Sequence, residues 1–244
     1  MVALVVLLML FAPIQESIVA QLDVEAVTSA EVGSLVWSPD RTALALGLSD
    51  GRILAWSFED DGIRWLGETS GYVVYDIAWS LDGQYIAWTA DTGIVIWHNA
   101  QPPTFSYLSN EHLDIVLRIA LSPDGSLLAS VADAPDRSVI IWNVETEKPL
   151  HKLEMDEGHF PFSVAFSPDS STLAVGRILG SVELWDVETG KRLNTLTGLS
   201  RETASIVWSL DGNTLAASSE MLLGSTEYKP CPMLTIVAWD VESS

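Results

Sequence analysis

The segment LVWSPDRTALALGLSDGRILAW, residues 35–56, contains the pattern that decides the fold. Its first part returns four times, as AWSLDG at 78–83, ALSPDG at 120–125, AFSPDS at 165–170 and VWSLDG at 207–212. The shared aspartates are spaced by 42, 42, 45 and 42 residues. Self-similarity at such a period predicts a chain built from repeated structural units.

Two further positions recur in every unit. Each unit ends in a tryptophan, and an isoleucine or valine stands three residues before it. The tryptophans are Trp56, Trp97, Trp142, Trp185 and Trp239, and the aliphatic residues are Ile53, Ile94, Val139, Val182 and Ile236. Agreement of five units at these positions indicates one structural design used five times.

The local chemistry of a unit favours β-structure. Runs such as SVIIW at 138–142 and SVELW at 181–185 are short and rich in β-branched residues. Ser-Pro-Asp-Gly is turn chemistry, because proline presets φ and glycine accepts positive φ. A unit of about 42 residues therefore predicts about four short antiparallel strands. The fold class is all-β.

At these residues the sequence resembles the WD-repeat family of β-propellers, over residues 21–244. The Trp-Asp pair that names the family stands at Trp185 and at Trp239, each followed by aspartate. The family's hydrogen-bonded tetrad can be matched in full only in unit three. Its structural candidates there are His112, Ser130, Asp136 and Trp142. The resemblance implies that apolar packing holds most of the other blades.

The resemblance implies a propeller of five four-stranded blades. The last unit stops three strands in, so we expect residues 22–28 to supply its fourth strand and close the ring. A small closed ring, an open arc that pairs with another chain, and a fragment of a longer propeller all remain open. We divide the chain into residues 1–20, a signal peptide or anchor, and residues 21–244, the propeller domain.

Composition excludes several classes of function. The 244 residues include 12 Lys and Arg against 33 Asp and Glu, a net charge of −21. Such an acidic chain lacks the clustered cations that nucleic acid requires, so no nucleic-acid partner is expected. The single cysteine, Cys231, excludes an internal disulfide framework and a cysteine-rich zinc site.

Residues 2–14, VALVVLLMLFAPI, are typical of the apolar core of a signal peptide. Cleavage after Ala20 fits the small residues that follow, although no Lys or Arg precedes the core. The alternatives are a retained anchor, a buried strand, and an N-terminus lost from a longer gene. We therefore expect an exported protein, secreted, periplasmic or on the outer face of the membrane, with membrane contact only if the segment is retained.

No stretch of the sequence predicts catalysis, a metal or a cofactor. Residues 47–51 match the G-x-S-x-G pattern of hydrolases, but no helix follows them, as that chemistry requires. No two of the four histidines have the spacing of a zinc site. We therefore predict that the protein is not an enzyme.

One segment breaks the repeat. From turn aspartate to tryptophan the units span 16, 15, 18, 16 and 28 residues, so unit five carries a long insertion within residues 218–233. Long loops in compact folds are usually either functional or disordered. Its partner-binding candidates are Met221, Leu222, Leu223, Tyr228 and Lys229. In the rival interpretation these residues fold back over the end of the propeller or plug its channel.

The sequence thus predicts a non-enzymatic scaffold, a β-propeller that presents loops to another protein. The alternative is a propeller enzyme or small-ligand binder that uses the central channel. Such a site needs convergent polar residues at the inner strand ends. The inner positions are mostly Val, Ile, Leu and Ala, which argues against the alternative.

Overall fold

A computed structural model describes residues 29–59, 62–109, 111–153, 155–156, 160–199, 203–219 and 235–241. These residues form nineteen β-strands and no helix. Within them no helix is long and apolar enough to cross a membrane. The signal or anchor segment 1–20 and the closing strand 22–28 lie outside the described residues.

The strands follow the repeat, because each unit of the sequence forms one sheet. Their bounds are β1 (Val32–Trp37), β2 (Ala43–Leu48), β3 (Arg52–Ser57), β4 (Ile63–Glu68), β5 (Ile77–Trp79), β6 (Tyr85–Ala90), β7 (Gly93–His98), β8 (Thr104–Leu108), β9 (Val116–Leu121), β10 (Leu127–Ala132), β11 (Val139–Asn143), β12 (Lys148–Leu153), β13 (Pro161–Phe166), β14 (Thr172–Arg177), β15 (Ser181–Asp186), β16 (Arg192–Thr197), β17 (Thr203–Trp208), β18 (Thr214–Ser219) and β19 (Ile236–Asp240).

Each sheet is an antiparallel meander in which every strand pairs with the next along the chain. Sheets one to four hold four strands each, from β1–β4 to β13–β16, and sheet five holds β17, β18 and β19. The all-β prediction and the blade design are confirmed. The fifth sheet has three strands among the described residues, and the prediction that residues 22–28 supply a fourth is not tested, since they lie outside the described residues.

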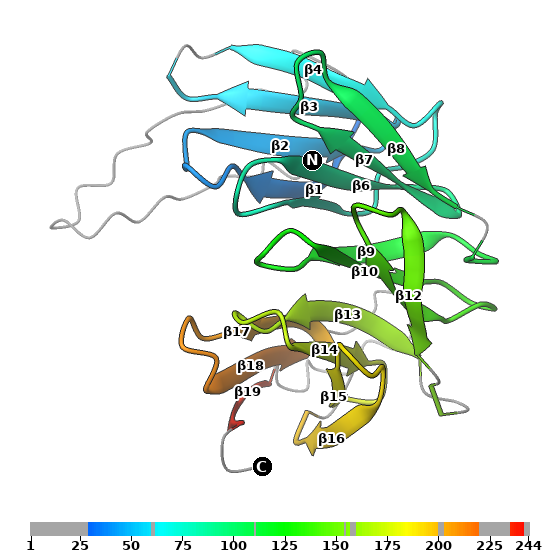
Figure 1. The fold of residues 1–244 in the computed structure, drawn as a ribbon, viewed down its shortest axis with the longest axis vertical. Helices are drawn as coiled ribbons and strands as arrows, with labels where there is room; N and C mark the ends of the chain where they lie inside the picture. Colours follow the sequence, from blue (N-terminus) through cyan, green and yellow to red (C-terminus); the bar gives the residue numbers. More distant parts are fainter. Residues whose placement is uncertain are drawn as a thin grey trace, which may run out of the picture.

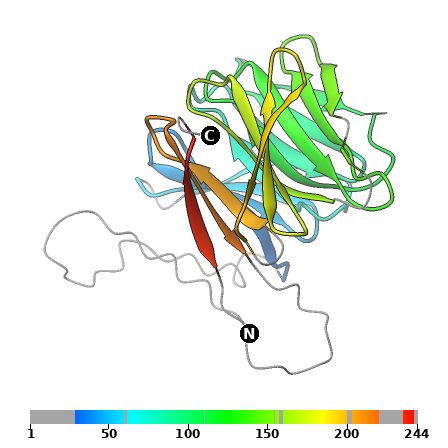
Figure 2. The ribbon, with the colours of Figure 1, turned by 90° about the horizontal axis from the view of Figure 1, so that it is seen from below.

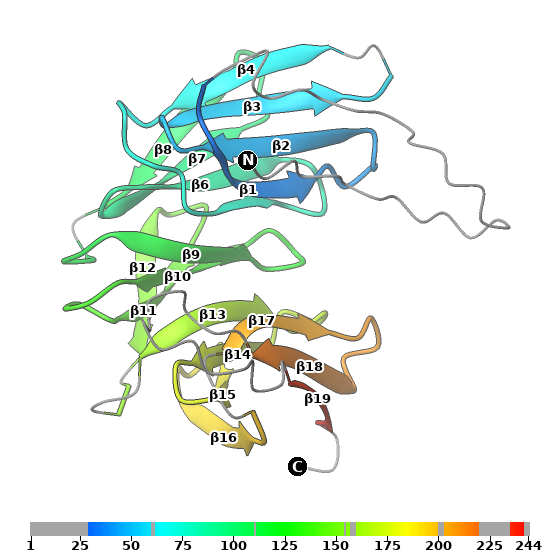
Figure 3. The same cartoon turned by 180° about the vertical axis from the view of Figure 1, so that it is seen from behind.

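The sheets pack face against face in chain order (Figures 1 and 2). The first strands of consecutive sheets contact one another, β1 with β5, β5 with β9, β9 with β13 and β13 with β17. The first and fifth sheets lie at opposite ends of the row (Figures 1 and 3). Closure into a ring is not seen among the described strands.

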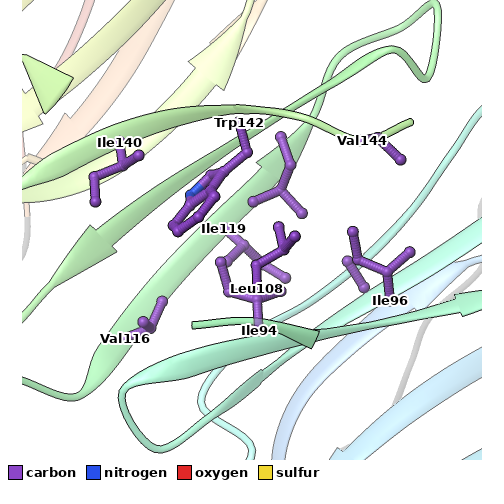
Figure 4. Packing of buried hydrophobic residues seen from close by; sticks show 10 residues of the cluster. Ile94, Ile96, Leu108, Val116, Ile119, Ile140, Trp142 and Val144 are labelled. Atoms are coloured by element: carbon purple, nitrogen blue, oxygen red, sulfur yellow. The ribbon is translucent and has the colours of Figure 1, made fainter. Parts of the chain in front are cut away.

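Apolar clusters fill the spaces between sheets. Between the second and third sheets, Ile94, Ile96 and Leu108 meet Val116 and Trp142 (Figure 4). The aliphatic position three residues before the tryptophan lies at the centre of such contacts. Ile53, Ile94, Val139 and Val182 are each 0% exposed. The repeat therefore positions one fully buried side chain at each contact between sheets.

The Ser-x-Asp turn is a second feature that recurs in all five units. In all five units the serine Oγ donates to the aspartate Oδ1 over 2.5–2.6 Å. The same Oγ accepts a backbone N–H five residues further on, over 2.9 Å. The next turn position has a positive φ, which glycine adopts in three units and Arg41 and Ser170 adopt in the others. This network fixes the hairpin between the first two strands.

We expect acid to destabilise the fold through these turns. The Ser167 hydroxyl, with the N–H of Ser171, lowers the pKa of Asp169 below its ordinary 3.8. A carboxyl whose pKa is lowered by folding adds stability above that ordinary value, and this stability is lost as the pH falls through the folded pKa. Ser167→Ala should weaken the pH dependence below about pH 4 and cost about 1 kcal/mol at neutral pH. Urea titrations at several pH values measure both effects, and an unchanged pH profile in the variant would contradict the assignment.

Candidate functional site

Unit three contains the hydrogen-bonded tetrad. The structure brings together His112, which precedes β9, Ser130 of β10, Asp136 of the β10–β11 turn and Trp142 of β11. His112 Nε2 lies 2.6 Å from Ser130 Oγ, and Trp142 Nε1 donates to the same oxygen over 2.8 Å. His112 Nδ1 lies 3.1 Å from Asp136 Oδ2. Burial lowers the pKa of His112 although the Asp136 carboxylate opposes this, so the imidazole is neutral at pH 7. The tetrad fixes a turn and two strands and is structural.

Unit four replaces the tetrad with buried charges. Val175 holds the register position of Ser130, opposite Glu183. The Glu183 carboxylate is 0% exposed and binds the guanidinium groups of Arg177 and, over 2.7 Å, Arg192. Burial lowers the pKa of Arg177, and the Glu183 charge opposes this shift. Trp185 Nε1 is buried and has no acceptor within the described part of the chain. This blade is held by an ion network in place of the tetrad.

One polar position recurs in every unit, on the first strand of the sheet or, for Asp76, immediately before it. In each unit this residue stands three positions before the aromatic or leucine residue that precedes the serine of the Ser-x-Asp turn. The five residues are Ser34, Asp76, Arg118, Ser163 and Ser205. The expectation of mostly apolar inner positions was therefore wrong for this position. The signal was present in the sequence, because all five residues are polar.

This position links each sheet to the next. Ser34 donates to Asp76 Oδ1 over 3.0 Å, and Asp76 Oδ2 accepts the N–H of Ile119 over 3.0 Å. Asp76 therefore joins three consecutive sheets. Burial raises its pKa above 3.8, whereas the Ile119 N–H and the Arg118 charge act in the opposite direction.

The same position also joins the third sheet to the fourth and the fourth to the fifth. The Arg118 guanidinium carbon lies 5.5 Å from the ring centroid of Phe162. Ser163 donates to the carbonyl of Thr203 over 2.8 Å. Together with the contacts of Ser34 and Asp76, these side chains form a polar line that crosses every contact between the described sheets.

A cavity of about 480 Å³ opens beside Asp76, between the first and second sheets. Polar side chains reach it from three sheets, namely Glu31, Ser34, Ser49, Asp76 and Arg118. Ser49 lies in the β2–β3 turn, so the cavity is on the face that carries the second-to-third strand turns. The cavity thus brings carboxylates and a guanidinium to one space, which makes it a candidate site for a polar group.

Neither a metal site nor the predicted hydrolase motif has the required geometry in the part of the chain that the structure describes. No three His, Cys, Asp or Glu side chains among them could hold a metal ion. In the G-x-S-x-G stretch, Ser49 Oγ accepts the N–H of Glu31, and Gly51 turns into β3 with φ of 90°. A β-hairpin with a bonded serine has no nucleophile elbow.

Ser219 and Thr235 are the described residues on either side of the unit-five insertion, and they are hydrogen-bonded to each other. We call this pair the unit-five neck. Ser219 N–H donates to the Thr235 carbonyl over 2.9 Å, and Thr235 N–H donates to Ser219 Oγ over 3.1 Å. This neck joins β18 to β19 and corresponds to the β2–β3 turn of unit one, which lines the cavity. The candidates Met221, Leu222, Leu223, Tyr228 and Lys229 lie outside the described residues.

Comparison with known proteins agrees with this geometry. Residues 104–143 and 147–186 match the family described as WD domain, G-beta repeat. Each match begins at or just before an outer strand, β8 or β12, and runs through the next three strands. The sheets and the tetrad define blades of the WD40 type. Units three and four of the chain thus match the WD repeat, and the other units share its strand arrangement.

Curated relatives share the repeat over part of their length. The chain is 25% identical over 171 residues to human pre-mRNA-processing factor 17, which covers 66% of the chain and 28% of the relative. It is 28% identical over 186 residues to the WD repeat-containing protein SL1-17 of Schistosoma mansoni, 71% of the chain and 57% of the relative. Rat apoptotic protease-activating factor 1 is 29% identical over 163 residues, 63% of the chain and 13% of the relative. The chain thus matches less than two thirds of the length of each.

The tetrad predicts unequal roles for two turn aspartates. Asp136 Oδ2 contacts His112, Ser138 and the N–H of Leu113. Asp91 holds the same position in unit two, and its carboxylate has no such network among the described residues. Asp136→Asn should lower the free energy of unfolding by about 1–2 kcal/mol more than Asp91→Asn. Equal losses in urea titrations would contradict a buried network.

The link through Asp76 predicts a graded loss. Asp76→Ala leaves the Ile119 N–H without its acceptor and should cost about 1–3 kcal/mol of unfolding free energy. Asp76→Asn retains one acceptor oxygen and should fall between wild type and Ala. Thermal and urea unfolding of the three proteins test this order, and a neutral Ala variant would show that the link adds no stability.

Proposed function

We propose that the protein is a non-enzymatic interaction platform that binds another protein through the face bearing the cavity and the unit-five neck. WD-repeat proteins generally act as scaffolds for binding other proteins. The observation that carries the proposal is the single long departure from a regular repeat. The unit-five insertion is joined to the described sheet at Ser219 and Thr235, which lie on the same face as the cavity.

The fold supplies the rigidity that such a platform requires. Every sheet is joined to the next by a fully buried aliphatic residue and by the polar line from Ser34 to Thr203. A rigid scaffold holds loops in place, so the loops and the cavity rim determine which partner binds. The partner is identified here only by class, as a protein. The net charge of −21 disfavours nucleic acid.

A second candidate function is the binding of a small ligand in the cavity. It is favoured by the convergence of Glu31, Asp76 and Arg118 on one space of about 480 Å³. Small-molecule sites are concave and carry a few polar groups that fix orientation. The same cavity would also receive one side chain of a bound protein. Export of the protein remains a proposal that rests on residues 2–14.

A variant with a shortened insertion tests whether unit five binds a partner protein, and a substitution in the cavity tests whether the cavity takes part. A variant in which residues 220–234 are replaced by Ile-Leu-Gly, as at residues 178–180 of unit four, should fold normally because a shorter loop costs less closure entropy. It should capture less partner protein in a pull-down from the native source, with the bound proteins identified by mass spectrometry. Glu31→Gln tests the cavity in the same assay.

The matched control is Leu210→Ser. Leu210 is 99% exposed in the Ser-x-Asp turn of the same unit, at the other end of the strands. This variant should capture as much partner as the wild type. If the shortened variant also captures the same proteins in full, the binding surface lies elsewhere. If it unfolds, the insertion covers the core and the rival interpretation is correct.

A further inference from the structure

Two opposite charges line the cavity between the first and second sheets without pairing to each other. Asp76 and Arg118 both border this space of about 480 Å³. Burial raises the pKa of Asp76 and the Arg118 charge acts in the opposite direction, so the two groups are near enough to interact. Yet none of the ion pairs in the described part of the chain joins them. The fold therefore holds two mutually attractive charges apart across one cavity.

Asp76 is fixed in place by three donors from the chain around it. Its Oδ1 accepts the Ser34 hydroxyl and the N–H of Ile77, each over 3.0 Å, and its Oδ2 accepts the N–H of Ile119 over 3.0 Å. A carboxylate has about four acceptor sites, so Oδ2 can take one further donor. A cationic donor beside Asp76 would offset the pKa increase that burial causes.

Arg118 is held by a different set of groups. Its Nη1 donates to the carbonyl of Leu117 over 2.8 Å, and its guanidinium carbon lies 5.5 Å from the ring centroid of Phe162. The hydrogen bond to Leu117 uses one N–H of the guanidinium and leaves most of its donors for another acceptor. The planar fork of an arginine matches the two oxygens of a carboxylate. Arg118 therefore provides a site for an anionic group on the cavity wall.

Glu31 adds a second carboxylate to the lining. Its main chain is anchored, because its N–H donates to Ser49 Oγ over 3.0 Å and its carbonyl accepts the N–H of Ser49 over 2.9 Å. The side chain is exposed, and its carboxylate has no partner among the described residues. A ligand with only a positive charge would be repelled by Arg118, and one with only a negative charge would be repelled by Glu31 and Asp76. The charges of the cavity therefore favour a ligand that carries both signs.

We propose that the cavity binds a small zwitterion of the α-amino acid class. The ammonium group faces Asp76 and Glu31, and the carboxylate binds the guanidinium of Arg118. Both charged groups of such a ligand are attached to one carbon, so a single molecule supplies a donor to one wall and a bidentate acceptor to the other. A volume of about 480 Å³ lies within the range of small-molecule sites and leaves room for a side chain. This inference rests on the second candidate function, the binding of a small ligand, and names the class of that ligand.

Isothermal titration calorimetry of the full chain with the standard free amino acids tests this proposal. At least one of them should bind at neutral pH, and two derivatives of that amino acid then measure the contribution of each charge. The amide lacks the carboxylate and the N-acetyl form lacks the ammonium group, so each should bind about tenfold more weakly or worse. If no amino acid binds, or if either derivative binds as tightly as its parent, the proposal is wrong.

Two cavity variants assign the two ends of the ligand. Arg118→Gln should weaken binding of the amino acid by about tenfold without weakening binding of its amide, because the amide has no carboxylate for the guanidinium. Glu31→Gln should weaken binding of the amino acid without weakening that of its N-acetyl form. The Glu31 side chain is exposed and unbonded, so this variant remains informative if Arg118→Gln fails to fold. A folded variant of either kind that binds the amino acid as the wild type does would overturn the proposal.

The matched control is Arg137→Gln. The guanidinium of Arg137 also lies over an aromatic ring, 3.5 Å from the ring centroid of Phe160, but it does not line the cavity. This variant should bind the amino acid as the wild type does, and a loss equal to that of Arg118→Gln would contradict the assigned site. The titrations use purified protein and no partner, so their failure leaves the partner-capture result of the platform function unaffected.

Discussion

The second strands of sheets one to four are buried on both faces, and the rest of the structure depends on covering both faces. A sheet with one solvated face alternates apolar and polar residues, whereas strands such as β6, β10 and β14 are buried along nearly their whole length. Burial of one Ile or Val side chain contributes about 1.5–3 kcal/mol. The gain is realised only when the neighbouring sheet is present. The units therefore stabilise one another as a linear array rather than as independent domains.

Polar groups are distributed differently from apolar ones along this array. The apolar contact is repeated almost unchanged, but unit three has the histidine tetrad, and unit four has Glu183 between two arginines. A buried ion pair must offset the cost of removing its charges from water, so it adds less net stability than its short contacts imply. The polar links thus fix register and orientation, whereas the aliphatic contacts supply most of the free energy.

The sequence predicted what depends on spacing within a unit. The period located every sheet, and the resemblance to WD repeats implied that His112, Ser130, Asp136 and Trp142 form one tetrad. The line from Ser34 through Asp76 was missed, because each of its members bonds to a residue about 42 positions away in the next sheet. The ion network of Glu183 was missed for a similar reason, since Arg177 and Arg192 flank it in sequence without a recognisable motif. The loop candidates and the closing strand 22–28 remain predictions, because they lie outside the described residues.

The position of the fifth sheet at the end of the array also bears on how the molecule opens. Sheets two to four each have a described sheet on both faces, whereas the fifth has one on a single face. Its separation from the fourth sheet exposes one cluster, which contains Leu184, Leu196 and Leu215, and leaves the other contacts between sheets intact. Amide hydrogens of β17, β18 and β19 should therefore exchange through a local opening that costs less than global unfolding, while those of β10 exchange only when the whole array separates. Among the described sheets, cooperativity is thus graded, and it is lower for the fifth sheet than for sheets two to four.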